Sequence, residues 1–307
     1  MQEIYDLVII GSGPAGLSAA VYGMRAGLNL LVVERNPMSG GQVLNTYEVD
    51  NYLGMPGING FDMGVKFREH ADKLGASFLE AEVTGLTEGE IKTVHTTEGD
   101  LRAKAVILAT GAHHAQLEVP GEEALSGMGV SYCATCDGAF YRGKTVAVVG
   151  GGDVALEDAI YLTRFCEKVY LIHRRDELRG AHVLQEQLRA LPGAEILYSH
   201  VVKEIQGQEA VTGVLLEDLK SGERRILSVD GVFVAVGIRP ETELLKDLAL
   251  CDEAGYVPAG EDGATGVPGI YVAGDIRRKP LRQVVTAVAD GANAVTAAAA
   301  WIGSITV

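Results

Sequence analysis

The sequence has few cysteines and few basic residues for its length. Four cysteines in 307 residues are too few for the disulfide framework of a small secreted protein. Lysine and arginine together number 26 against 41 acidic residues, which gives a formal net charge of −15. Binding to nucleic acid or to an anionic membrane needs a basic face. The charge balance therefore argues against both partners and favours a soluble protein.

Long hydrophobic runs are also lacking. Segment 1–6 has no basic region before the first apolar run, and Asp290 and Asn293 interrupt the alanine-rich stretch near the C-terminus. A signal peptide requires a basic region, and a membrane span requires about 20 predominantly apolar residues. We therefore expect a cytoplasmic protein without a membrane segment.

Glycine is abundant, with 39 residues that follow no repeat, so a collagen-like chain is excluded. Residues 5–11 form an apolar run that leads into Gly11-Ser-Gly-Pro-Ala-Gly16. A helix is predicted to about Gly27, and a second apolar run ends at Glu34. Strand, glycine turn, helix and strand in this order are typical of a dinucleotide-binding unit, where the pyrophosphate meets the helix N-terminus.

A second copy of the same pattern follows. Residues 144–150 lead into Gly150-Gly-Gly-Asp-Val-Ala155, a helix is predicted to about Phe165, and a strand ends at His173. The spacing from first glycine to the end of the second strand equals that of the first copy. Two glycine-rich turns without a ligand are the alternative. The strand and helix around each turn favour nucleotide binding.

The residue at the ribose position distinguishes the two ligands. Glu34 can accept both ribose hydroxyls and would repel a 2′-phosphate, which suits FAD or NAD. His173 is followed by Arg174, Arg175 and Arg179, and guanidinium groups suit a dianionic phosphate. The second site is therefore predicted to prefer NADP, with a solvated charge cluster as the alternative.

The order of the motifs predicts an α/β fold in which one Rossmann-like domain is inserted into another. Segments 101–112 and 269–275 share a strand-then-glycine form and flank the second unit. The predicted domains are 1–115 with 242–307 for the first nucleotide and 116–241 for NADP. Segments 113–119 and 238–243 are the expected hinges.

Cys133 and Cys136 form a C-x-x-C pair just before the second glycine motif. Zinc would need more ligands, and His113 and His114, which flank an interdomain turn, are poor candidates. Two free structural thiols are a further alternative. Thiol–disulfide exchange fits better, because it needs two sulfurs close together and an electron source.

Three further residues bear on the thiol chemistry. Asp137 follows Cys136 directly and is a candidate general acid/base, the alternative being a simple turn residue. Cys166 and Cys251 stand alone in the sequence, and we expect both to be buried apolar residues.

The sequence resembles the low-molecular-weight thioredoxin reductases along essentially its whole length. The matching motifs are GSGPAG at 11–16, GGQ at 40–42, EVDN at 48–51, ATGA at 109–112, VSYCATCDG at 130–138, GGGDVA at 150–155, HRRDELR at 173–179, AGD at 273–275 and RQVVTA at 282–287. The resemblance implies a homodimer in which electrons pass from NADPH through FAD and the cysteine pair to thioredoxin. It also implies that Cys136 lies nearer the flavin and that Cys133 attacks the partner disulfide.

The resemblance extends the expected cofactor sites. It implies that Gln42 and Asn51 lie near the isoalloxazine, Val83 near the adenine, and Asp275 on the ribityl chain. The expected FAD-binding residues are Gly11, Ser12, Gly13, Pro14, Ala15, Gly16, Glu34, Arg35, Gly40, Gly41, Gln42, Asn51, Val83, Ala109, Thr110, Gly111, Gly274, Asp275, Arg282, Gln283 and Val284. The expected NADPH-binding residues are Gly150, Gly152, Asp153, Val154, His173, Arg174, Arg175 and Arg179.

One position departs from the family pattern and bears on the partner. The family often has a basic residue where this chain has Met128, so the partner can be another thioredoxin-like protein. The sequence leaves three different functions open: a flavin-dependent dithiol oxidase, the reductase of a peroxiredoxin-reducing system and a non-catalytic flavin-binding module.

Because the cysteine pair and the NADP motif share one domain, we expect this domain to swing between half-reactions. A fixed arrangement using both flavin faces is the alternative.

Overall fold

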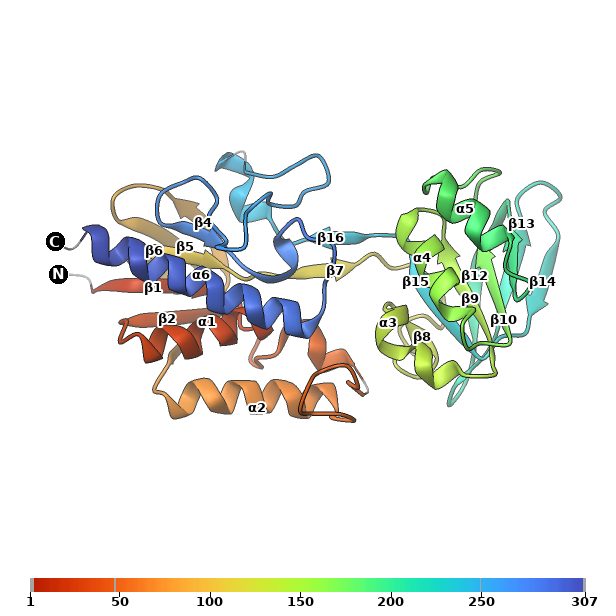
Figure 1. Cartoon of the computed structure of the whole chain (residues 1–307), viewed down its shortest axis with the longest axis horizontal. Coiled ribbons are helices and arrows are strands. Elements are labelled where there is room, and N and C mark those ends of the chain that lie inside the picture. Colours follow the sequence, from red (N-terminus) through yellow and green to blue (C-terminus); the bar gives the residue numbers. More distant parts are fainter. Residues whose placement is uncertain (1–2, 47, 249, 306–307) are drawn as a thin grey trace. The chain divides into compact units, whose positions relative to one another are not determined.

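A computed structural model describes residues 3–46, 48–248 and 250–305 of the chain (Figure 1). The chain forms two compact units, here called the first unit (Met1–His113 with Arg239–Val307) and the second unit (His114–Ile238). The predicted boundaries after 115 and 241 differ from these by two and three residues. The two connections between the units contain β7 (Ala112–His114) and β16 (Ile238–Pro240), which pair with each other.

The first unit is built on a mixed sheet with the strand order β3-β2-β1-β6-β5-β4, and β17 also pairs with β6. Its strands are β1 (Ile4–Ile10), β2 (Leu30–Glu34), β3 (Ser77–Glu80), β4 (Val83–Thr87), β5 (Lys92–Thr96), β6 (Gly99–Leu108) and β17 (Ile270–Val272). β1, β2, β3, β6 and β17 run parallel, whereas β4 and β5 pair antiparallel.

The helices of the first unit follow from local sequence signals. They are α1 (Pro14–Arg25), η1 (Gly41–Asn45), α2 (Gly60–Lys73), η3 (Glu243–Leu248), η4 (Gly274–Ile276) and α6 (Val284–Ile305). Pro14 opens α1, because its fixed φ suits the first helical turn. Asn59 caps α2 by accepting a hydrogen bond from the Phe61 amide at 2.9 Å. α1 ends at Arg25, two residues before the predicted Gly27, which has a φ of +74°.

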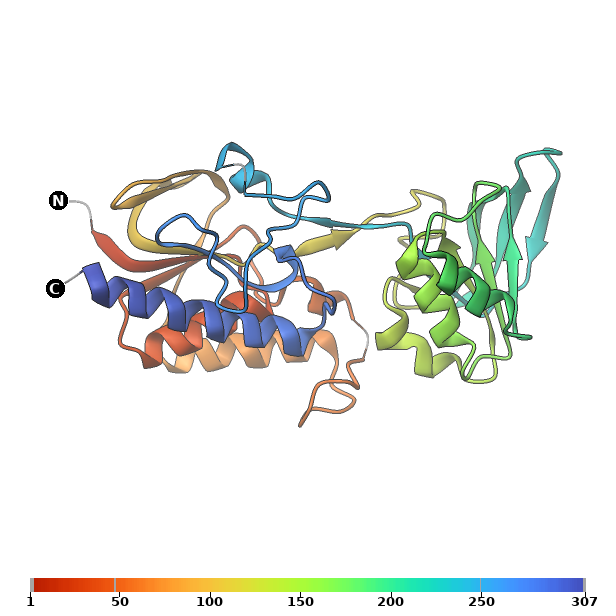
Figure 2. The same ribbon diagram turned by 45° about the horizontal axis from the view of Figure 1, so that its top comes forward.

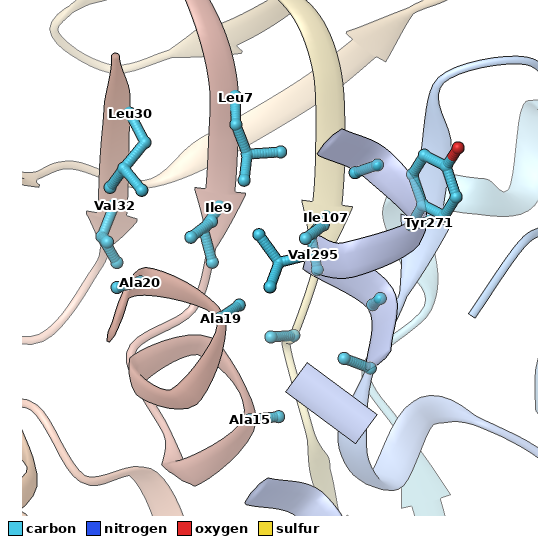
Figure 3. Close-up of a cluster of buried hydrophobic side chains, with 14 of the residues drawn as sticks. Leu7, Ile9, Ala15, Ala19, Ala20, Leu30, Val32, Ile107, Tyr271 and Val295 are labelled. Atoms are coloured by element: carbon cyan, nitrogen blue, oxygen red, sulfur yellow. The ribbon is translucent and has the colours of Figure 1, made fainter. Parts of the chain in front are cut away.

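One large hydrophobic cluster of the first unit lies between the central strands and the helices α1 and α6 (Figure 3). Leu7, Ile9 and Ile107 are fully buried on this face, where Val295 of α6 packs. α6 can lie close to α1 because position 291 is glycine. A Cβ atom there would lie 2.0 Å from the carbonyl oxygen of Ala15.

α6 corrects one expectation from the sequence. Its 22 residues make it, among the described residues, the one helix long and apolar enough to cross a membrane, although the sequence pattern predicted no such run. Asp290 lies in the second turn of α6 and is only 7% exposed. Because α6 packs along α1 in the core, we assign it as a core helix.

The second unit is a parallel sheet covered on both faces. Its elements are β8 (Val130–Ser131), α3 (Ala134–Asp137), η2 (Gly138–Tyr141), β9 (Thr145–Gly150), α4 (Asp153–Leu162), β10 (Lys168–Ile172), α5 (His182–Arg189), β11 (Ala194–Leu197), β12 (His200–Gly207), β13 (Val211–Asp218), β14 (Arg224–Leu227) and β15 (Gly231–Ala235). The parallel strands have the order β11-β10-β9-β15-β8. Helix α4 covers one face, and the antiparallel sheet β12-β13-β14 covers the other (Figure 2).

The predicted fold class is confirmed, since two Rossmann-like α/β units are present and one interrupts the other in sequence. Two further details differ from the predictions. α4 ends at Leu162 and not near Phe165, because the chain turns there and the amide of Phe165 donates to the carbonyl of Leu162. Cys166 is buried as predicted, whereas Cys251 is only half-buried.

Candidate active site

Parallel strands of the first unit bring several predicted residues to one edge of its sheet. Gly11 follows β1, Glu34 ends β2, Ala109 follows β6, and Gly274 lies just after β17. Nucleotides bind at the carboxyl ends of the strands in sheets of this kind. The structure therefore brings together segments that are far apart in the sequence.

The first glycine loop has the shape of a phosphate cradle. Gly11 has a φ of +99°, and a Cβ atom there would lie 2.5 Å from the Ala109 carbonyl oxygen. A Cβ atom on Gly16 would lie 1.9 Å from the Gly11 carbonyl oxygen. At Gly13, by contrast, a Cβ atom would meet only the Gly41 Cα, at 3.9 Å. Two glycines thus close the loop, and the third leaves its backbone open to a ligand at the start of α1.

Glu34 is fixed at the entrance to this loop. Its Oε2 accepts hydrogen bonds from the Ser12 amide and the Ser12 hydroxyl, both at 2.8 Å. Its Oε1 accepts from the Asn36 amide at 3.0 Å. The carboxylate therefore lies beside the loop, where it would repel a phosphate on the ribose. Arg35 is exposed and lies 3.7 Å from the Glu241 carboxylate.

The remaining predicted residues of the first unit also gather around this edge. The Gly40 amide donates to the Ser12 carbonyl at 2.9 Å, and Gln42 Nε2 donates to the Ala112 carbonyl. Asn51 Nδ2 donates to Gln283 Oε1 at 3.0 Å, which joins the segment after η1 to the segment before α6.

The segment after β6 is held by the second connection. Thr110 Oγ1 donates to the Glu241 carbonyl at 2.5 Å, and the Glu241 amide donates to the Gly111 carbonyl at 2.9 Å. Val83 opens β4 and is half-buried against a hydrophobic cluster that includes Val33 of β2. Glu241 was not predicted, because nothing in the local sequence marks it as a contact of both Thr110 and Arg35.

Three buried side-chain atoms of the described residues have no hydrogen-bond partner, Asp275 Oδ1, Arg277 Nε and Arg282 Nε, and the first and last of these belong to predicted FAD-binding residues. Asp275 lies in η4, and Arg282 lies just before α6 with its guanidinium 4.1 Å over the Tyr256 ring. A carboxylate oxygen accepts from a hydroxyl, and a guanidinium N–H donates to a carbonyl or an anion. Such unsatisfied buried atoms fit a ligand with a hydroxylated chain and a carbonyl-bearing ring, as FAD has.

In the second unit, the cysteine pair and the second glycine loop lie at the same edge of one sheet. β8, β9, β10 and β15 run parallel, so their carboxyl ends share an edge. Cys133 lies two residues after the end of β8, Gly150 ends β9, and His173 follows β10. A ligand bound at this edge and the disulfide would therefore be carried by the same sheet.

The second glycine loop is closed on one side and open on the other. A Cβ atom on Gly150 would lie 2.4 Å from the Ala235 carbonyl oxygen, and one on Gly151 would lie 2.2 Å from His173 Nδ1. A Cβ atom on Gly152 would meet nothing within 4 Å. Asp153 Oδ1 accepts from the Ala181 amide at 2.6 Å and fixes the segment that follows β10. Val154 is exposed on the first turn of α4.

His173 is packed under the loop instead of facing solvent. It is 4% exposed, and its Nε2 lies 3.0 Å from the Glu177 carbonyl oxygen. Burial lowers the pKa of the imidazole. In the structure His173 contacts the main chain of its own loop. Its contact with the cofactor stays a prediction.

The three arginines differ from His173 in their exposure. Arg174, Arg175 and Arg179 are exposed, and none forms an ion pair with an acidic side chain in the part of the chain that the structure describes. The Arg179 amide donates to the Gly151 carbonyl at 2.7 Å, which keeps this arginine beside the glycine loop. Three uncompensated guanidiniums next to an open loop fit a dianionic phosphate.

A fourth cation comes from another part of the fold. Lys220 follows β13, and its Nζ lies 2.8 Å from Asp176 Oδ1. Asp176 also accepts from the Ser199 hydroxyl, and the Ser199 amide donates to the Arg175 carbonyl at 3.1 Å. Lys220 was missed because only the folding of β13 against this loop brings it there.

Cys133 and Cys136 form a disulfide with a Cα–Cα distance of 5.3 Å, and both residues are half-buried. The Cys133 amide donates to Ser131 Oγ at 3.1 Å, and Ser131 Oγ donates to Asp137 Oδ2 at 2.6 Å. Burial raises the pKa of Asp137, and the hydrogen bond from Ser131 opposes this shift. A carboxyl group that binds a proton more tightly than usual therefore lies beside the disulfide. Ser131 was not among the predicted residues.

Known proteins share this organisation. A family model described as pyridine nucleotide-disulphide oxidoreductase matches residues 5–291. A thioredoxin reductase of Listeria innocua is 45% identical over 94% of this chain and 91% of its own length. The thioredoxin reductase of Bacillus subtilis is 44% identical over 94% of this chain and 92% of its own length.

Solved structures agree with these relatives. The crystal structure of thioredoxin reductase from Streptococcus pyogenes is 42% identical and has a TM-score of 0.95, covering 99% of this chain and 100% of its own. The thioredoxin reductase from Giardia duodenalis is 35% identical with a TM-score of 0.92, covering 98% of this chain and 100% of its own.

Proposed function

The chain belongs to the pyridine nucleotide-disulphide oxidoreductase family, and we propose that it is a thioredoxin reductase that uses FAD and NADPH. The predicted family is confirmed by the relatives described above, and membership implies a flavin and a pyridine nucleotide. The observation that carries the proposal is the shared edge of the second unit. That edge holds the Cys133–Cys136 disulfide, an open glycine loop and three uncompensated arginines.

The first unit would hold FAD at the carboxyl edge of its sheet. The open backbone at Gly13 suits the pyrophosphate, Glu34 suits the ribose hydroxyls, and Asp275 Oδ1 and Arg282 Nε supply buried polar atoms that still need partners. When bound, FAD supplies a centre that accepts a hydride and passes two electrons on to a disulfide.

The second unit would hold NADPH at its own carboxyl edge. The loop from Gly150 to Gly152 places main-chain amides at the start of α4, where a pyrophosphate is favoured. Arg174, Arg175 and Arg179 would bind the 2′-phosphate, which is absent from NADH. The preference for NADPH over NADH then rests on charge that no described acidic side chain neutralises.

The disulfide carries the electrons to the protein substrate. Two electrons and two protons convert it into two thiols, and Cys133 as a thiolate attacks the disulfide of oxidised thioredoxin. The resulting mixed disulfide is resolved by the Cys136 thiolate, which restores the Cys133–Cys136 bond and releases reduced thioredoxin. Asp137 lies beside the sulfurs, where burial raises its pKa and favours the transfer of protons, and it is the proposed general acid/base.

The second unit would turn between the two half-reactions. Both the disulfide and the glycine loop lie on its one carboxyl edge, and each has to approach the same flavin. Two short connections join the units, at residues 113–114 and 238–239. We propose that the second unit rotates as a body about these connections, where a few residues absorb the change in backbone angles.

The partner, assembly and location follow from the same family. Thioredoxin is the proposed protein substrate, the enzyme is proposed to act as a homodimer, and a cytoplasmic location agrees with the reducing chemistry. Met128 lies five residues before Cys133 and is 44% exposed. Because its side chain is uncharged, it adds no positive charge for an acidic partner.

Steady-state turnover tests the proposal and separates it from a dithiol oxidase. NADPH oxidation should depend on oxidised thioredoxin, and it should stay slow when oxygen or glutathione disulfide replaces thioredoxin. A panel of thioredoxin-like proteins identifies the preferred partner. Rapid NADPH oxidation with oxygen alone, together with formation of a small-molecule disulfide, would instead establish an oxidase.

A further inference from the structure

The first unit contains a cluster of charged side chains that the proposed reaction does not use directly. Arg277 is 6% exposed and Asp290 is 7% exposed, and the side chain of Lys279 is 8% exposed. Charged groups are costly to bury unless they are paired. Together with Asp275, the cluster contains two positive and two negative groups, so its formal charge is balanced.

The contacts show that Arg277 and Lys279 have different roles in this cluster. The Arg277 guanidinium pairs with Asp290 Oδ1, and the Gly274 amide donates to Asp290 Oδ2 at 3.0 Å. These contacts of Asp290 join α6 to η4 and to the residue that follows it. Asp290 already has a cationic partner in Arg277, so Lys279 is not needed to neutralise it.

Lys279 connects three separate points. Its Nζ lies 3.0 Å from Asp290 Oδ2 in the second turn of α6, 3.4 Å from Thr286 Oγ1 in the first turn, and 3.3 Å from Asp275 Oδ1 in η4. The contact with Asp275 lacks the alignment of a hydrogen bond, so Oδ1 stays without a hydrogen-bond donor among the described residues. Lys279 thus attracts the carboxylate and leaves this oxygen able to accept from a ligand hydroxyl.

Thr286 links Lys279 to the residues before α6. The Gln283 amide donates to Thr286 Oγ1 at 3.1 Å, and Thr286 Oγ1 lies 3.1 Å from the Leu281 carbonyl oxygen. The segment that presents Arg282 is therefore shaped by the threonine that Lys279 contacts. Asp275 and Arg282 carry the two unsatisfied buried atoms of the proposed FAD site, and Lys279 bridges the segments of both.

We propose that Lys279 is a positioning residue for FAD. It holds the Asp275 carboxylate and the first turn of α6 in the relative placement that the flavin half of the cofactor requires. The inference rests on the proposed function, because it concerns the FAD site assigned above. It also has an electrostatic consequence. Loss of Lys279 leaves the cluster with one excess negative charge, which disfavours the added electrons of reduced FAD.

The test compares three variants of the FAD-loaded enzyme. Lys279→Gln removes the charge, Lys279→Arg keeps it, and Lys246→Gln is the matched control, since Lys246 is an exposed lysine paired with Glu243 in the same unit. FAD release on dilution is followed by flavin fluorescence, and the flavin reduction potential is measured by equilibration with a redox dye. Unfolding is followed separately by circular dichroism.

Lys279→Gln should release FAD about tenfold faster, the lower end of the effect of losing one hydrogen bond to a charged group. Its reduction potential should move to a more negative value. Lys279→Arg should retain most of both properties, and Lys246→Gln should match the wild type. A folded Lys279→Gln enzyme with unchanged release and potential, whatever its unfolding temperature, would overturn the inference.

Thr286→Val is the replacement variant if Lys279→Gln does not fold, because it keeps the lysine and removes the hydroxyl that joins Lys279 to the segment before α6. It should speed FAD release about threefold, within the effect of a neutral hydrogen bond, and unchanged release would overturn the inference. Wild-type protein that binds no FAD would contradict the proposed function itself, whereas failure of the variants alone contradicts only the role of Lys279.

Discussion

Ser131 joins Cys133 to Asp137: its hydroxyl accepts a hydrogen bond from the Cys133 amide at 3.1 Å and donates one to Asp137 Oδ2 at 2.6 Å. The first cysteine of the disulfide and the proposed proton carrier are thus held by one small side chain. Burial raises the pKa of Asp137, and the Ser131 hydrogen bond is the opposing influence.

Substitution at this serine should change the pH dependence of disulfide reduction. In Ser131→Ala the carboxylate loses its donor, so the pKa of Asp137 should rise further and the pH profile should move to higher pH.

Asp137→Asn should slow thioredoxin reduction by about 10²- to 10⁴-fold, the usual contribution of a general acid/base. Rapid-mixing measurements between pH of about 5 and 9 check both. An unshifted profile in Ser131→Ala would show that Asp137 does not titrate in the reaction.

The arginines after β10 should determine the choice of pyridine nucleotide. Arg174→Ala and Arg179→Ala should each lower kcat/KM for NADPH by about 10- to 150-fold, because each loses a hydrogen bond to a charged phosphate. The kinetics with NADH should hardly change. Arg225→Ala, an exposed arginine on β14, is the matched control. Equal losses with both nucleotides would mean that the arginines only support the loop.

Asp158 in α4 should make the stability of the enzyme depend on pH. Burial, with repulsion from Glu157, raises the pKa of Asp158 to about 7. The folded state then binds a proton that the unfolded state lacks between about pH 4 and 7. The free energy of unfolding should therefore fall by up to about 1.4 kcal/mol per pH unit as pH rises through this window.

Asp158→Asn removes this titration. Urea unfolding at pH values of about 5.5, 6.5 and 7.5 should show that the stability difference between variant and wild type grows in favour of the variant as pH rises. A pH-independent difference would show that Asp158 is ionised in the folded enzyme throughout the range.

Rotation of the second unit should be essential for turnover. A chemical crosslink between the two units, confirmed by mass spectrometry and placed away from both nucleotide sites, should preserve one half-reaction and abolish steady-state thioredoxin reduction. A crosslink within one unit serves as the control. Full turnover of the crosslinked enzyme would show that a fixed arrangement suffices.

The sequence predicts the parts of the structure that depend on local patterns. Gly11, Gly16 and Gly150 sit where added side chains would clash with the main chain, so their spacing alone indicates the two loops. The positions of Glu34 and of the arginines after His173 could be predicted, because each lies where a predicted strand ends. The pairing of Cys133 with Cys136 follows from their separation of three residues.

Contacts that depend on packing between distant segments could not be predicted. Lys279 and Asp290 meet only because α6 lies against η4 and α1. Lys220 reaches the arginine loop through the folding of β13. The burial of His173 could not be predicted either, because it depends on the missing side chain of Gly151, whose space the imidazole occupies.

The electron path itself is tested by one rapid-mixing measurement. The enzyme is reduced with NADPH without oxygen and then mixed with oxidised thioredoxin, while the visible flavin absorbance is followed. The wild-type flavin should be reoxidised within the turnover time, and the double variant Cys133→Ser/Cys136→Ser should be reduced by NADPH but stay reduced. Reoxidation of the double variant by thioredoxin at the wild-type rate would contradict a path through the Cys133–Cys136 disulfide.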